Sequence, residues 1–134
     1  MSSERVVEVK VRRVSGYARG EVVKVWRLSF LGDVDPETGR LRESGKSIDG
    51  KILVVHSFRG STVGTYVIYA LASRKRAPNA IVSVNPDPVV IAGCILGGIP
   101  FAYGLPEEIY ELLEDCDVLE LRPPNTVVVR KRCR

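Results

Sequence analysis

Three short apolar runs lie in the second half of the chain, and segments with helical spacing separate them. The runs occupy 51–57 (KILVVHS), 80–84 (AIVSV) and 99–103 (IPFAY). Each has the length of a β-strand, and the first has the continuous apolar character of a strand buried on both faces. Strands that alternate with helices form parallel sheets. The sequence therefore predicts a mixed α/β domain with a part-parallel central sheet.

Helices are predicted between and after these runs. Apolar residues recur at helical spacing over 62–75, and a second helix is expected from 89 to about 96. The turn 85–88 (NPDP) could cap the second helix, and the glycine pair 97–98 should end it. A short acidic helix is expected over 106–114, with proline in its first turn.

The two ends of the chain add further strands. Alternating patterns predict strands over 5–14 and 18–27, and again over 117–122 and 126–132. The last two are separated only by 123–125 (PPN), which indicates a hairpin. We expect these end strands to pair antiparallel, and we expect the whole chain, residues 1–134, to form a single domain.

The composition is that of an ordinary globular protein. Hydrophobic residues make up 45% of the 134 residues and charged residues 27%. No apolar run approaches the roughly 20 residues that cross a bilayer, and the N-terminus has no apolar stretch of the signal-peptide kind. We expect a cytoplasmic protein.

The net charge is +4, and basic residues gather near the two ends of the chain, above all over 130–134 (RKRCR). A basic tail is compatible with a nucleic-acid-binding module. No aromatic-rich recognition motif accompanies the charge, so a solvated terminus is the simpler interpretation.

The three cysteines, Cys94, Cys116 and Cys133, are widely spaced and form no C-x-x-C pair. Neither a zinc site nor a redox motif is indicated, and we expect buried or incidental thiols. His56 is the only histidine, and no second histidine or close carboxylate cluster joins it. A metal site within this chain is therefore not expected.

The segment 56–66 (HSFRGSTVGTY) is the most informative for function, because it joins a buried strand to a helix. Free backbone N–H groups and the positive end of the helix dipole meet at such a junction. Ser61 or Thr62 would cap the helix in any fold. A cap does not account for Arg59 beside Gly60, where a guanidinium could help to hold a carboxylate or phosphate. The residues leave a plain cap and an anion-binding or catalytic loop both open.

Two familiar interpretations of this loop fail. The lysine of a nucleotide-binding P-loop is missing. A Ser–His–Asp triad would have to use His56, and the residues around Ser61 (GSTVG) do not form the G-x-S-x-G nucleophile elbow. The segment 28–47, rich in Gly, Asp and Ser, is a second candidate, because long irregular segments in compact domains are usually functional or mobile.

Three motifs together resemble the swivel domain of the aconitase X family. They are LSFLGDVDPETG at 28–39, FRGSTVG at 58–64, and APNAIVSV with GCILGGIPF between 77 and 101. The resemblance extends from about Gly16 to Tyr103, and the order of the three motifs makes it specific. It implies a swivelling β/β/α domain that closes over an active site as the small subunit of a hydro-lyase.

The resemblance also implies a large partner subunit, in a heterodimer or higher assembly, without which this chain is inactive. That partner carries the iron–sulfur cluster, expected to be [4Fe-4S], and this chain binds no cofactor by itself. The reaction implied is dehydration of (R)-5-phosphomevalonate to trans-anhydromevalonate 5-phosphate, in a modified archaeal mevalonate pathway to isoprenoids. Dehydration of another hydroxy acid, such as a hydroxyproline, is the alternative within the family.

By the same resemblance, Ser61 is the catalytic base. The candidate substrate-binding residues are Arg59, Gly60, Thr62, Gly32 and Asp35, and no residue is assigned to a metal. Classical aconitases have an arginine shortly after the paired serines, whereas Val63 and Gly64 follow here. Which group supplies the positive charge that binds the substrate therefore stays open, and the partner subunit is one alternative source.

Overall fold

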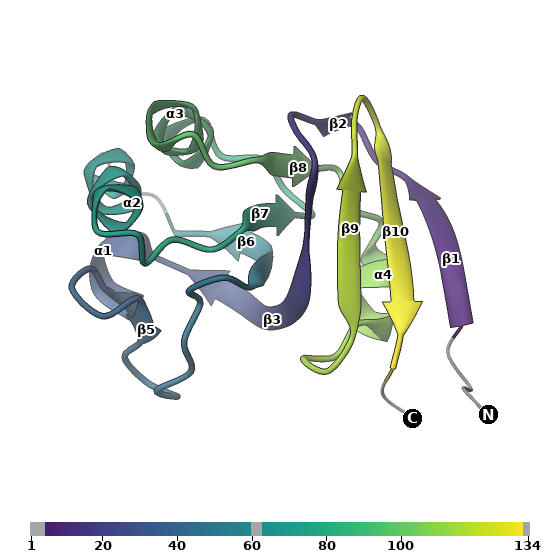
Figure 1. The fold of residues 1–134 in the computed structure, drawn as a ribbon, viewed down its shortest axis with the longest axis horizontal. Helices are drawn as coiled ribbons and strands as arrows, with labels where there is room; N and C mark the ends of the chain where they lie inside the picture. Colours follow the sequence, from purple (N-terminus) through teal and green to yellow (C-terminus); the bar gives the residue numbers. More distant parts are fainter. Residues whose placement is uncertain (1–4, 60–62, 133–134) are drawn as a thin grey trace.

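The computed structural model describes residues 5–59 and 63–132 (Figure 1). The strands are β1 (Arg5–Lys10), β2 (Arg13–Val14), β3 (Ala18–Leu28), β4 (Val34–Asp35), β5 (Arg40–Leu41), β6 (Ile52–Phe58), β7 (Ala80–Ser83), β8 (Phe101–Tyr103), β9 (Val118–Arg122) and β10 (Thr126–Lys131). The helices are α1 (Phe30–Asp33), α2 (Gly64–Ser73), α3 (Pro88–Gly97) and α4 (Glu107–Leu112). Three site predictions, Gly60, Ser61 and Thr62, lie outside the described residues.

One mixed sheet contains most of the strands, in the order β1-β10-β9-β3-β6-β7-β8-β2. Strands β3, β6, β7 and β8 run parallel, and the strands toward either edge pair antiparallel. Helices α2 and α3 lie together beside the parallel strands, while β9, β10 and β1 form a separate upright layer in Figure 1. The predicted mixed α/β fold, with its part-parallel sheet and added antiparallel strands, is confirmed.

Strand β3 joins the two parts of the sheet. Its first four residues, Ala18–Glu21, pair antiparallel with β9, and the remainder, from Val22 to Leu28, pairs parallel with β6. The expectation that this strand pairs only antiparallel is therefore wrong for its second half. An 11-residue strand is long enough to curve from one partner to the other, as Figure 1 shows.

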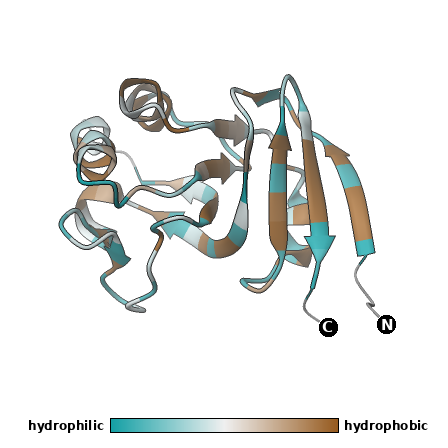
Figure 2. Cartoon of the chain, viewed as in Figure 1, coloured by the Kyte–Doolittle hydropathy of each residue, from teal (hydrophilic) through white to brown (hydrophobic). Residues whose placement is uncertain are grey.

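Strand β6 is buried on both faces, as its continuous apolar sequence predicts. Ile52 and Val54 face one hydrophobic cluster, whereas Leu53 and Val55 face a second, and all four side chains are inaccessible to solvent. The first cluster contains residues of α4, β9 and β10, and the second contains residues of α1, α2 and α3. Hydrophobic residues accordingly dominate β7, β9 and β10 in Figure 2.

The cap predicted for one helix is confirmed, whereas the cap predicted for another concerns residues that the structure does not describe. Helix α2 has Val63 at its N-cap, and the predicted cap by Ser61 or Thr62 falls on residues outside the part of the chain that the structure describes. Helix α3 is capped as predicted: the Asp87 side chain accepts from two backbone N–H groups of its first turn. Gly98, at φ 69°, ends this helix, because an L side chain is disfavoured there.

Three further predictions are corrected. The single strand expected over 5–14 is two strands, since β1 pairs with β10 and β2 with β8. The segment 28–47 is not irregular throughout, because it contains α1, β4 and β5. Cys116 is disulfide-bonded, whereas Cys94 is a free, buried thiol as expected.

The basic C-terminal residues are partly neutralised within the fold. Lys131 lies in β10 and forms an ion pair with the buried Asp117. Arg130 Nη2 lies 3.7 Å from Glu120 Oε1. These side chains therefore do not form an open cationic tail. None of the described helices is both long and apolar enough to span a membrane.

Candidate active site

The candidate site lies where β3 and β6 end side by side. Their parallel register pairs Arg27 with Ser57 and Leu28 with Phe58. The Arg59 N–H donates to the Leu28 carbonyl at 2.9 Å, which holds the start of the predicted loop against the end of β3. Ligands of open α/β sheets bind outside the carboxyl ends of the strands. The sheet thus brings two of the three sequence motifs to such an edge.

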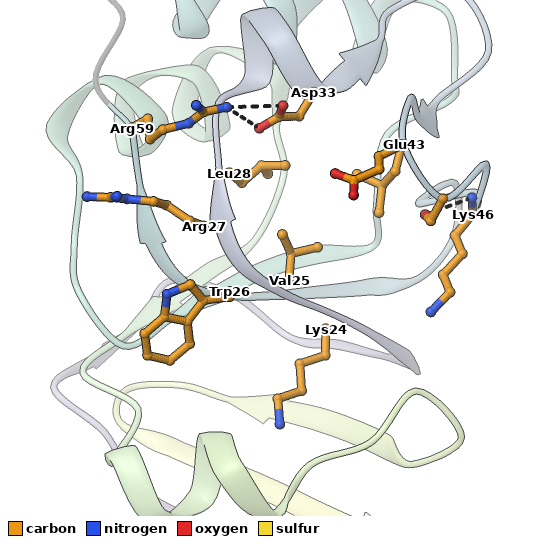
Figure 3. A pocket seen from close by; sticks show the side chains of 11 residues that line it. Lys24, Val25, Trp26, Arg27, Leu28, Asp33, Glu43, Lys46 and Arg59 are labelled. Carbon is orange, nitrogen blue, oxygen red and sulfur yellow. Dashed lines mark hydrogen bonds and ion pairs between the residues drawn. The ribbon is translucent and has the colours of Figure 1, made fainter.

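A pocket of about 540 Å³ opens at this edge (Figure 3). Its lining residues come from the end of β3, from α1 and from the segment that follows it, together with Arg59: Lys24, Val25, Trp26, Arg27, Leu28, Asp33, Leu41, Glu43, Ser44, Lys46 and Arg59. The lining combines charged side chains with an exposed tryptophan. Such a mixture suits a small, charged ligand.

Asp33 holds Arg59 in place at the upper side of this pocket in Figure 3. Its two carboxylate oxygens lie 3.1 and 3.2 Å from Arg59 Nη2. One of them also accepts from the Ser29 backbone N–H at 2.8 Å, and the Ser29 hydroxyl accepts in turn from Gly32 N. This reciprocal capping fixes the short helix α1, and with it the carboxylate that orients the guanidinium.

The sequence reasoning missed Asp33, although it selected two neighbours of this residue. A serine followed four residues later by an aspartate at a helix start was the available signal. It was obscured because the surrounding glycine, aspartate and proline residues favoured an irregular loop.

The two neighbours have local roles. Gly32 lies in α1, and a Cβ added there would meet only Ser29 atoms, none closer than 3.8 Å. Asp35 accepts from the Glu37 backbone N–H at 2.9 Å, and this hydrogen bond is the main cause that lowers the Asp35 pKa. Asp35 shapes a turn and does not line the pocket described above. Substrate contact by either residue stays a prediction.

The sole histidine is packed and hydrogen-bonded. His56 is 9% exposed, its Nε2 lies 2.8 Å from Glu107 Oε2, and its Nδ1 lies 2.9 Å from Ser57 Oγ. The Trp26 ring stacks on the imidazole with 4.0 Å between centroids. This arrangement orients Trp26 at the pocket wall, and it agrees with the interpretation of His56 as a packed residue.

Tyr110 contacts both rings from the side. Burial is the main cause that raises the pKa of Tyr110 to about 12, and the nearby Asp115 and Glu107 carboxylates act in the same direction. The phenol is therefore protonated at neutral pH. Lys24 Nζ lies 4.5 Å from the centroid of the Tyr110 ring and makes a cation–π contact with it.

The described residues offer no ligand set for a metal or cluster. Within residues 5–59 and 63–132, no three His, Cys, Asp or Glu side chains are grouped to hold a metal ion. Cys94 lies in α3, and burial raises the pKa of its thiol to about 12. This thiol stays protonated at neutral pH, whereas a metal ligand must be a thiolate.

Comparison with known proteins agrees with the motifs. Residues 8–129 match the family described as the aconitase X swivel domain. The phosphomevalonate dehydratase small subunit of Aeropyrum pernix is 49% identical over 102 residues, which are 76% of each chain. The corresponding subunit of Methanothermobacter thermautotrophicus is 43% identical over 122 residues, covering 86% of this chain and 93% of its own.

Solved structures share the fold as well as the sequence pattern. A crystal structure of Thermococcus kodakaraensis aconitase X in its holo-form superposes with a TM-score of 0.83 and is 37% identical. The match covers 92% of this chain and 98% of that chain. The chain therefore belongs to the family of aconitase X swivel domains.

Proposed function

We propose that this chain is the small subunit of a phosphomevalonate dehydratase, a hydro-lyase of the aconitase X family. The observation that carries the proposal is the alignment, over most of their length, with several relatives that bear this name. The reaction is the dehydration of (R)-5-phosphomevalonate to trans-anhydromevalonate 5-phosphate, in a modified mevalonate pathway in the cytoplasm.

The small subunit needs a large partner for this reaction. We assign the iron–sulfur cluster, expected to be [4Fe-4S], to that partner. When bound there, the cluster would act as a Lewis acid that polarises the C–O bond of the departing hydroxyl. The contribution of the present chain is to bind the substrate and to move a proton.

Ser61 is the proposed base that removes the proton from the carbon next to the substrate carboxylate. A free serine hydroxyl is far too weakly acidic to act as an alkoxide at neutral pH, so nearby positive charge must stabilise the oxyanion. The positive end of the α2 dipole and neighbouring backbone N–H groups are proposed to supply it, and Arg59, which is paired with Asp33, is proposed to bind the substrate. Gly60 and Thr62 are proposed to contact the substrate with backbone and hydroxyl groups.

The test is reconstitution with the large subunit and measurement of dehydration of (R)-5-phosphomevalonate. We expect Ser61→Ala to lower kcat by about a hundredfold or more, the usual effect of losing a positioned base. Ser73→Ala, which changes an exposed serine at the end of α2, is the matched control and should retain activity. Gel filtration should show that both variants still assemble with the large subunit. Near-normal turnover by assembled Ser61→Ala would refute the role of the serine.

The substrate assignment has its own test. The reconstituted enzyme is offered (R)-5-phosphomevalonate, unphosphorylated mevalonate and a hydroxyproline. We expect turnover only with the phosphorylated acid. Turnover of hydroxyproline alone would refute the assignment of phosphomevalonate as the substrate, while the assignment of the reaction as a dehydration would stand.

A further inference from the structure

The pocket at the end of β3 and β6 carries an excess of positive charge. Its charged lining residues are the cations Lys24, Arg27, Lys46 and Arg59 and the carboxylates Asp33 and Glu43. Charges that converge on a concave, partly desolvated surface attract ligands of the opposite sign more strongly than they would in open solvent. The pocket therefore favours an anionic ligand.

Three of the four cations already have partners. Lys24 Nζ donates to two backbone carbonyl oxygens, at 3.0 and 3.3 Å. Lys46 Nζ lies 2.6 Å from an Asp115 oxygen, and Arg59 is paired with Asp33. A ligand would have to displace a partner before any of these groups could give it full contact.

Arg27 differs from the other three. Its side chain is exposed and makes no hydrogen bond or ion pair to any part of the chain that the structure describes. In the view of Figure 3, Arg27 lies between the side chains of Arg59 and Trp26. Its guanidinium is thus available at the same edge as Arg59, whose only ion-pair partner among described residues is the exchangeable Asp33.

We propose that this pocket binds a phosphomonoester group, with Arg27 as the principal contact and Asp33 as a competitor for Arg59. A guanidinium presents a planar fork of donors that matches phosphate oxygens, and two such groups suit a dianion better than one. Asp33 neutralises Arg59 while the pocket is empty, and a phosphate that enters takes over part of this role. This inference rests on the proposed function in one respect: the phosphate is that of the substrate.

The single tryptophan gives a direct probe. Trp26 is 59% exposed and lines the pocket, so the emission of the full chain should change in a saturable way when inorganic phosphate is titrated at constant ionic strength. Phosphorus NMR of the same titration measures binding without relying on the tryptophan. Chloride at equal ionic strength should produce no saturable change.

The two central variants should act in opposite directions. Arg27→Gln should weaken phosphate binding about tenfold or more, because a charged, bidentate contact is lost. Asp33→Asn should tighten phosphate binding severalfold, because it frees Arg59 and removes a negative charge, while its amide oxygen can still cap Ser29 N.

Matched controls exist for both variants. Arg13→Gln removes an exposed arginine from β2, at the far edge of the sheet. Asp49→Asn breaks a second surface pair, with Arg76, whose side chains have the same exposed fractions as the Asp33–Arg59 pair. Neither control should change phosphate affinity. Equal phosphate affinity in the Arg27→Gln variant and the unmodified chain would overturn the proposal.

The two-subunit enzyme separates this inference from the proposed function. In the reconstituted enzyme, Arg27→Gln should raise the KM for the phosphorylated substrate about tenfold, with a much smaller change in kcat. Turnover with an unchanged KM in this variant would refute the phosphate site and leave the proposed function standing. Phosphate binding that depends on Arg27, in an enzyme that does not dehydrate the substrate, would support the site and refute the function.

Discussion

Lys131 and Asp117 form a buried ion pair that supports the antiparallel layer. Lys131 Nζ lies 2.6 Å from Asp117 Oδ2, and the side chains are 7% and 0% exposed. The ammonium also donates to the Leu112 carbonyl at 2.8 Å. The carboxylate accepts from the backbone N–H groups of Glu114 and Arg132 as well. The pair thus ties β10 to the chain that enters β9.

Replacement of the lysine in Lys131→Met keeps an unbranched apolar stem but takes the ammonium of Lys131 away from the buried Asp117 carboxylate. Removal of one partner from a buried pair costs about 3–5 kcal/mol, because the remaining charge stays desolvated. Whole domains are stable by only about 5–15 kcal/mol, so this loss is a large share of the total. With the usual unfolding entropy per residue, it lowers the Tm by about 10–18 °C.

The assay is urea unfolding followed by circular dichroism, with the free energy of unfolding compared between variants. Lys51→Met is the control, because its partner Glu21 lies 3.0 Å away in a pair that is 35% and 58% exposed. Such a pair contributes about 0–1 kcal/mol. Addition of Asp117→Asn to Lys131→Met should recover part of the loss by removing the buried negative charge. A loss below about 1 kcal/mol in Lys131→Met would refute the reasoning.

Three further predictions concern α3. Gly93→Ala would place a Cβ 2.9 Å from two Ile68 atoms. We expect it to lower the free energy of unfolding, measured by thermal unfolding, by about 1–3 kcal/mol. Gly32→Ala is the control and should not be destabilising, because a Cβ there meets no atom closer than 3.8 Å. Cys94 should resist iodoacetamide at pH 8 in the folded protein, since its pKa is about 12, and equal modification of folded and unfolded chain would contradict this. Because that folded-state pKa lies above the ordinary thiol value of 9.0, the contribution of Cys94 to stability should be complete below about pH 9 and fall toward pH 12, with a shallower fall in Cys94→Ala.

The parallel strands were the easiest part of the fold to predict. The KILVVHS run is apolar at every position from Ile52 to Val55, and only a strand covered on both faces needs such a sequence. The cap of α3 was equally local, since Asp87 and Gly98 act on residues next to them. The curved path of β3 was not predictable in this way, because its two partners, β6 and β9, lie far apart in the sequence.

The same distinction applies to the candidate site. Arg59 was selected from its position between a strand and a helix, and the structure places it at the pocket. Asp33 and Arg27 were not selected, although they line the same pocket. Asp33 lies 26 residues from its partner Arg59, and Arg27 belongs to an otherwise ordinary alternating strand. The serine four residues before Asp33 is a local signal of the helix cap only, and neither Asp33 nor Arg27 carries a local signal that it lines the pocket with Arg59.

The amino-acid sequence by itself determined the alternation of strands and helices, the burial of β6 and the family. The first two follow from residue patterns a few positions long, because backbone geometry repeats over such distances. The family follows from the resemblance of three motifs that occur in a fixed order. Only the tertiary structure decided which charges face one another. The parallel pairing of β3 with β6 brings Arg27 and Asp33 to the edge where Arg59 begins its loop, and the resulting balance of charge exists only in three dimensions.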